Sequence, residues 1–310
     1  VDVKPDEELG ETLATWGWYE PPEDGFGLTL GANGNAVMLS GKTVHACEPF
    51  ALYAWPEAYQ QVTDTKLVGV GAISQGFVIL TQSHPYLLLG ADPSSYQMVK
   101  LDANQACVAK RSIVEMRNGV VYASPDGLYA VDATGVHHLT EKLMTRDDWQ
   151  ALKPESIHAY ELDGQYLAFY DTGSETGCLI FQFGSQPFLT RAAQYCTAAY
   201  NDPLRDALYV MQGSEIRKWD AGAPLEYTWR SKEFRARDAV YAFARVEADA
   251  YPLTLRWYVD GVLAHTATVE SAAPFRLPAR HIQGYSSYEV TAATTVHAVT
   301  FASSSEEMLQ

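Results

Sequence analysis

Apolar and polar residues alternate with a period of two along most of this 310-residue chain. Such alternation indicates β-strands that turn one face toward a core. Asn118-Gly119, Asp126-Gly127 and Asp163-Gly164 interrupt the pattern with dipeptides that favour tight hairpins. The pattern therefore predicts an all-β chain. The clearest predicted strands span residues 67–73, 77–81, 86–89, 112–116, 120–124, 128–131, 157–161, 166–170, 178–183 and 207–211.

These strands recur in units of similar length. Comparable strand openings fall near Leu28, Val68, Ser112, Ser156 and Cys196, at steps of 40, 44, 44 and 40 residues. A period of about 40–45 residues with four strands in each unit is typical of β-propeller blades. Because one such sheet cannot bury both of its faces alone, the units are expected to stack around an axis. An irregular series of hairpins with coincidental spacing is the alternative.

One predicted helix and one change in strand length and alternation complete the predicted layout. Thr145, followed by Asp148 at the capping-box position and by Pro154, predicts a short helix between two blades. From residue 227 the chain shows longer alternating strands, with Asp260-Gly261 as a hairpin turn, which is typical of a β-sandwich. We therefore predict an amino-terminal extension over residues 1–27, four-stranded propeller blades over 28–224, and a β-sandwich over 225–310.

The net charge of the chain argues against one class of function, the binding of nucleic acids. The chain carries 22 Lys and Arg against 38 Asp and Glu, a formal net charge of −16. Proteins that grip DNA or RNA present a basic surface, so this balance argues against groove binding. No apolar run approaches the roughly 20 residues that span a bilayer, so we expect no membrane insertion. The acidic amino end has none of the features of a signal peptide.

The motifs that commonly carry chemistry are missing or incomplete. There is no G-x-S-x-G elbow. His137 and His138 are adjacent on a predicted strand and should point to opposite faces, and His45 with Cys47 gives only two of the ligands that a zinc site needs. The glycines of GVGAISQG at residues 69–76 have the wrong spacing for a phosphate loop and fit strand-edge glycines better.

Cysteines and carboxylates do not change this interpretation. Cys47, Cys107, Cys178 and Cys196 are irregularly spaced, which indicates free thiols half-buried in strands. A glycosidase needs two carboxylates about 5–9 Å apart, and the sequence identifies no such pair. We therefore predict no catalytic, cofactor-binding or metal-binding residues, no cofactor, and a protein that is not an enzyme.

Several segments resemble one known family. They are CVAKRS at 107–112, YASPDGL at 122–128, the helix segment 145–154 with Trp149, residues 166–170, Pro21-Pro22, Asn33-Gly34, Glu48-Pro49, Ala54-Trp55-Pro56 and Trp229-Arg230-Ser231-Lys232. Together they are similar to the tail nozzle or tail-hub proteins of short-tailed bacteriophages (podoviruses), the group called tail tubular protein B. The likeness covers roughly residues 16–235. Proteins of this family are generally longer, so closing the propeller would require further strands or a partner. Their amino-terminal portion helps to build a platform domain, so the resemblance implies that residues 1–27 are an extension or a partial platform segment and that the sandwich over 225–310 is platform-like.

The resemblance implies a structural component of a short phage tail, located in the tail of the virion. By the family's pattern the chain would form a ring of identical copies, a hexamer, that contacts portal, adaptor and other tail proteins. Genomic DNA would pass through the ring as non-specific cargo, and an acidic lining would repel its phosphates. Two alternatives remain open: a receptor- or carbohydrate-binding propeller on the tail, and, ranked third, a glycosidase.

Overall fold

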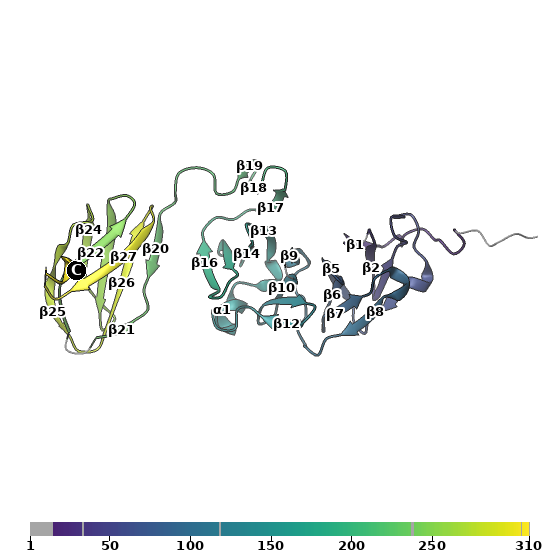
Figure 1. The fold of residues 1–310 in the computed structure, drawn as a ribbon, viewed down its shortest axis with the longest axis horizontal. Helices are drawn as coiled ribbons and strands as arrows, with labels where there is room; N and C mark the ends of the chain where they lie inside the picture. The colour runs from purple at the N-terminus through teal and green to yellow at the C-terminus, as the bar shows by residue number, and fades with distance from the viewer. Residues whose placement is uncertain (1–14, 33, 118, 237–238, 305, 310) are drawn as a thin grey trace, which may run out of the picture. The chain divides into compact units, whose positions relative to one another are not determined.

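The computed structural model describes residues 15–32, 34–117, 119–236, 239–304 and 306–309. The chain divides into two compact units, Val1–Trp219 and Asp220–Gln310 (Figure 1). The part of the predicted extension that falls on residues 1–14 lies outside the described residues.

The first unit is a series of five antiparallel sheets, each formed by strands that follow one another along the chain. The first four sheets have four strands, β1–β4, β5–β8, β9–β12 and β13–β16, and the fifth has three, β17–β19. Five sheets with local connections match the five predicted units, so the propeller-like arrangement of four-stranded blades is confirmed.

The bounds of these strands are β1 (Phe26–Leu30), β2 (Ala36–Ser40), β3 (Thr43–Ala46), β4 (Gln61–Val62), β5 (Leu67–Ile73), β6 (Gly76–Thr81), β7 (Tyr86–Leu89), β8 (Gln97–Lys100), β9 (Val114–Met116), β10 (Gly119–Ser124), β11 (Gly127–Asp132), β12 (Gly135–His138), β13 (His158–Leu162), β14 (Gln165–Asp171), β15 (Thr176–Gln182), β16 (Phe188–Ala192), β17 (Ala198–Asp202), β18 (Ala207–Gln212) and β19 (Glu215–Lys218).

Each central sheet buries both of its faces. On β6, Phe77 and Ile79 pack into the core shared with the first sheet, while Val78 and Leu80 pack into the core shared with the third. Successive side chains of a strand point to opposite faces, so a nearly continuous apolar strand supplies two cores. The same division holds for β10 and β14, and the sheets also touch in sequence through β1, β5, β9, β13 and β17.

Glycines on β5 allow the second and third sheets to approach closely. A Cβ atom at Gly71 would lie 2.6 Å from Cγ2 of Val120, nearer than side-chain carbons pack. The glycines of the GVGAISQG segment therefore lie within strands or at a hairpin, as predicted, and make room for a neighbouring sheet.

The predicted helix is present as α1 (Arg146–Ala151). The hydroxyl of Thr145 accepts a hydrogen bond from the backbone N–H of Asp148 at 3.2 Å. Trp149 is buried between the third and fourth sheets, and its Nε1 donates to the carbonyl oxygen of Ser124 at 2.8 Å. The helix thus fills the gap between two blades.

One predicted strand start is wrong. Residues 110–112 form a single 3-10 turn, and the strand begins only at β9. Ser112 explains the difference, because its hydroxyl donates to the carbonyl oxygen of Ala109 at 2.7 Å and accepts from the N–H of Ala123 at 2.9 Å. These side-chain hydrogen bonds satisfy backbone groups that strand pairing would otherwise satisfy.

The second unit is the predicted β-sandwich. One sheet has the order β20-β26-β23-β24, with β21 also paired to β26, and the other has the order β25-β22-β27. Trp257, 1% exposed, lies in the core between them. The strands are β20 (Tyr227–Arg230), β21 (Phe234–Arg235), β22 (Ala239–Ala248), β23 (Leu253–Val259), β24 (Val262–Val269), β25 (Phe275–Ile282), β26 (Tyr285–Ala292) and β27 (Val296–Ala302).

Replacing Trp149 tests the core between the third and fourth sheets. We expect Trp149→Ala to lower the free energy of unfolding of the first unit by about 3–5 kcal/mol, because it leaves a cavity and an unpaired carbonyl. Phe188→Ala, at a side chain of the fourth sheet that is 53% exposed, is the control and should cost far less. Urea denaturation followed by circular dichroism measures both, and equal losses in the two variants would contradict the assignment.

Candidate protein-binding surface

The fifth sheet ends the series and has one face without a following sheet. Cross-strand partners share a face, and on this sheet they form two rows: Ala198 with Met211 and Ile216, and Tyr200 with Tyr209 and Lys218. Leu208 and Val210 point the other way, into the core shared with the fourth sheet. We call the surface formed by Tyr200, Tyr209, Met211, Ile216 and Lys218 the bare face.

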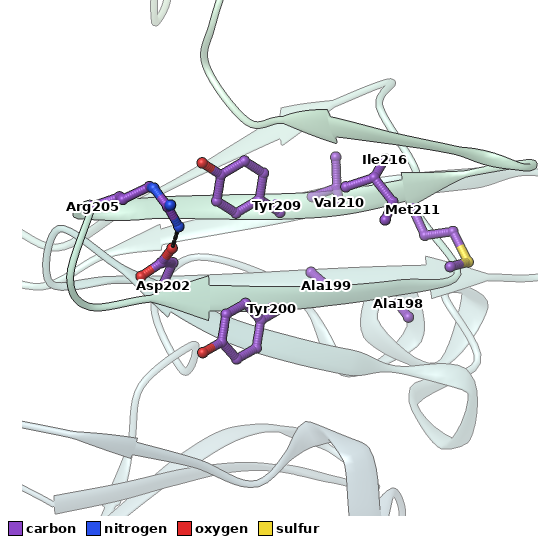
Figure 2. A pocket seen from close by; sticks show the side chains of 9 residues that line it. All are labelled: Ala198, Ala199, Tyr200, Asp202, Arg205, Tyr209, Val210, Met211 and Ile216. Carbon is purple, nitrogen blue, oxygen red and sulfur yellow. Dashed lines mark hydrogen bonds and ion pairs between the residues drawn. The ribbon is translucent and has the colours of Figure 1, made fainter.

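The bare face exposes large apolar side chains. Tyr200 is 66% exposed and Ile216 is 71% exposed, whereas Val78 and Leu80, which face the third sheet from β6, are 0% exposed. The face forms an open hollow of about 390 Å³. Figure 2 shows Tyr200 and Tyr209 on neighbouring strands at its middle, with Met211 toward one end. Contiguous exposed apolar surface of this kind marks interaction sites in soluble proteins.

An ion pair lies at the other end of the hollow (Figure 2). Nη1 of Arg205 is 2.7 Å from Oδ2 of Asp202, and the hydrogen bond from Arg205 holds the pKa of that carboxyl below its usual value. The other oxygen of Asp202 accepts from the N–H of Leu204 at 3.0 Å. Asp202 therefore has partners within its own turn, and the polar groups left at the middle of the hollow are the two phenol hydroxyls.

The opposite end of the series is covered by the chain itself. The outward face of the first sheet contains Ala36 and Met38, which pack against Cys47 and Trp55. Trp55 is held by a hydrogen bond from its backbone N–H to the carbonyl oxygen of Tyr19, at 2.9 Å. Segments 15–25 and 47–59 thus cover this face with irregular chain.

The covering segments carry their own exposed apolar side chains. Phe50 is 84% exposed, Trp16 79% and Tyr53 70%, and the ring of Tyr53 contacts that of Trp18 edge to face. We call the surface formed by Trp16, Tyr19, Phe50, Leu52 and Tyr53 the aromatic cap. The first unit therefore has an apolar surface on each of its two terminal sheets.

A second hollow, of about 460 Å³, lies over turns of the first three sheets. The two acidic side chains that line it already have hydrogen-bond or ion-pair partners. Glu115 accepts from the N–H of Ala72 at 2.7 Å, and Asp132 accepts from the N–H of Thr134 at 2.7 Å and lies 3.2 Å from Nε2 of His137. These contacts hold the turns together.

The histidines and cysteines singled out in the sequence do not converge. His137 pairs with Asp132 while His138 stacks on Tyr129 at 4.4 Å, so their predicted opposite orientation is confirmed. Over the described ranges, no three His, Cys, Asp or Glu side chains are placed to hold a metal ion.

The four cysteines are free and fully buried rather than half-buried. Burial raises the pKa of the Cys107 thiol to about 12 and that of Cys196 to about 11. In the part of the chain that the structure describes, no helix is long and apolar enough to cross a membrane.

Comparison with known proteins gives likeness of fold only. No protein-family model and no curated protein sequence matches the chain. Among solved structures, it is similar to Hsv2 from Kluyvelomyces marxianus (10% identity, 60% of this chain and 55% of that one, TM-score 0.35). It is also similar to the dihydro-heme d1 dehydrogenase NirN (11% identity, 84% of this chain and 58% of that one, TM-score 0.38). A third similar structure is an exo-β-1,3-galactanase from Phanerochaete chrysosporium (8% identity, 89% of this chain and 80% of that one, TM-score 0.32). The chain thus spans little more than half the length of the first two.

These matches correct the prediction that the chain is not an enzyme. The galactanase and NirN are enzymes, so proteins that share this propeller-like fold include catalysts, and the fold gives no ground for excluding catalysis. At TM-scores of 0.32–0.38 the likeness assigns no substrate to this chain. None of these three similar proteins is a phage tail protein.

Acid should weaken the attachment of the fifth sheet, because His158 is buried beneath it. Its ring stacks on Phe169 and contacts Tyr195, and burial together with the charge of Arg111 lowers its pKa from 6.5 to about 4. The unfolded chain then binds a proton between pH 6.5 and 4 that the folded chain does not, so stability is complete above pH 6.5 and falls toward pH 4.

His158→Phe tests this effect. We expect the wild type to lose about 2 kcal/mol more stability than the variant between pH 7 and pH 4.5. Urea midpoints measured at both pH values give the difference. The same loss in both proteins would show that His158 does not titrate in this way.

Proposed function

We propose that the chain is a structural component of a short phage tail, a nozzle or hub protein whose copies assemble into a ring around the DNA ejection conduit. The observation that carries the proposal is the bare face, where a sheet of the propeller series leaves Tyr200, Met211 and Ile216 in contact with solvent. An apolar face of this kind becomes stable when another protein surface covers it, as in permanent assemblies.

The identity that we propose for that assembly rests on sequence resemblance. The segments similar to podovirus tail nozzle proteins include helix α1 with its buried Trp149, and residues 122–128, which form the hairpin between β10 and β11. Their buried side chains, Tyr122, Leu128 and Trp149, lie in the cores between blades. They support a shared architecture, and the ring, its six-fold symmetry and its location in the virion tail follow as parts of the proposal.

Charge supports the same function. With a formal net charge of −16 the chain repels nucleic acid phosphates at long range. A conduit has to let DNA slide and not bind it, so the acidity suits contact with DNA as cargo. Portal, adaptor and other tail proteins are the partners that this role requires.

A second function is favoured by one observation. Tyr200 and Tyr209 line an open hollow beside Asp202 and Arg205, and sugar rings bind on aromatic side chains flanked by polar groups. In this alternative the chain is a carbohydrate- or receptor-binding propeller of the tail. Binding on a glycan array that Tyr200→Ala abolishes would favour this function.

Tail particles assembled with and without the chain test the proposed function. We expect electron microscopy of particles that lack the chain to show a tail without its nozzle, and particles supplied with the chain in trans to regain it. A complete nozzle in the absence of the chain would refute the proposal. Retaining the portal ring in both preparations is the control, because it shows that earlier assembly steps were not affected.

A further inference from the structure

We propose that the bare face of one copy binds the aromatic cap of a second copy, so that copies join head to tail. This inference deepens the proposed function and rests on it for the statement that the chain works as an assembly of copies. It adds which two surfaces meet. The surfaces belong to the fifth and the first sheet of the same unit.

The interfaces within the chain indicate what the bare face accepts. Four times along the first unit, the apolar face of one sheet is covered by an apolar face of the next, and the second and third sheets show the chemistry: Val78 and Leu80 meet Val120 and Tyr122. The bare face has the same kind of composition, with Tyr209 and Met211 on its central strand. It therefore continues an existing series of interfaces, and an apolar and aromatic surface fits it.

The aromatic cap is such a surface at the other end of the series. Phe50 and Trp16 are about four-fifths exposed, at 84% and 79%. The segments that carry them are fixed from beneath by Trp55, which is 3% exposed. A surface held in place in this way loses little conformational freedom on binding, which favours association.

Charge favours contact between the bare face of one copy and the aromatic cap of another over contact between two bare faces. Segments 15–25 and 47–59 contain five acidic residues and no Lys or Arg: Glu20, Glu23, Asp24, Glu48 and Glu57. The bare face contains Lys218, which forms no ion pair with another described residue. The cap, whose segments carry acidic but no basic side chains, thus complements the bare face. Two bare faces meeting each other would bring like charges together and leave both caps uncovered.

Contact between unlike surfaces has a geometric consequence. Each copy keeps one unused surface of each kind after the first contact, so association continues until a ring closes. A symmetric pair of identical surfaces would stop at two copies. The two arrangements can be separated by mixing variants that each lack one surface.

The experiment uses three variants of the full chain. Ile216→Glu places a negative charge on the bare face, and the double variant Phe50→Asn with Tyr53→Ser removes two side chains of the cap. Asn suits position 50 because Phe50 has a φ of 60°, which Asn adopts readily. Val262→Glu, at a position in the sandwich that is 64% exposed, is the matched control. Light scattering across a range of concentrations gives the mass of each protein and of a one-to-one mixture of the first two.

We expect the wild type and Val262→Glu to form species larger than dimers. Ile216→Glu and the double variant should each stay at the mass of one chain, and their mixture should reach twice that mass, because one intact face meets one intact cap. A dimeric double variant would overturn the inference in favour of face-to-face pairing. A wild type that stays monomeric, or masses that neither variant changes, would also overturn it. The proposed function is judged separately by the tail particles, which can lack their nozzle whichever surfaces join the copies.

Discussion

A β-sheet with two apolar faces has to be covered on both sides, and the first unit is built around this constraint. Strands such as β6 and β14 carry apolar side chains in both directions, so each central sheet takes part in two cores. Neighbouring sheets approach closely where glycine replaces a side chain, as at Gly71. In such a series every interior sheet is covered on both faces by its neighbours, whereas each terminal sheet has one face that no neighbouring sheet covers.

The two ends meet the constraint differently, and this difference gives the molecule its candidate site. At the first sheet, Trp55 and its flanking segments close the core, and the exposed aromatic residues lie on irregular chain. At the fifth sheet, regular strands face solvent directly. The polar groups nearby, Asp202 and Arg205, satisfy each other, so the surface between them and Ile216 is suited to contact with another large molecule. The proposed role of the fifth sheet therefore rests on its uncovered apolar face.

The sequence allowed most of the fold to be predicted. Central strands such as 77–81 and 86–89 were located to within one or two residues, because burial on both faces makes them short, nearly continuous apolar runs. Edge strands such as β19 were missed, since all four of its residues are exposed and carry no alternation. The bare face could not be predicted, because Tyr200, Tyr209 and Met211 have the same pattern as residues that a following sheet covers. Which apolar face lacks a partner is a property of the whole series.

Contact between consecutive sheets alone has an energetic consequence for the first unit. An interior sheet is stabilised by two neighbours, while the fifth sheet is attached through one core, that of Leu208, Val210 and Cys196 with the fourth sheet. Free energy in such a series is a sum of nearest-neighbour terms, so opening can begin at an end without disturbing the middle. The fifth sheet is then expected to open more readily than the interior sheets. A partner that covers it would protect the same amide hydrogens that the isolated chain exchanges first.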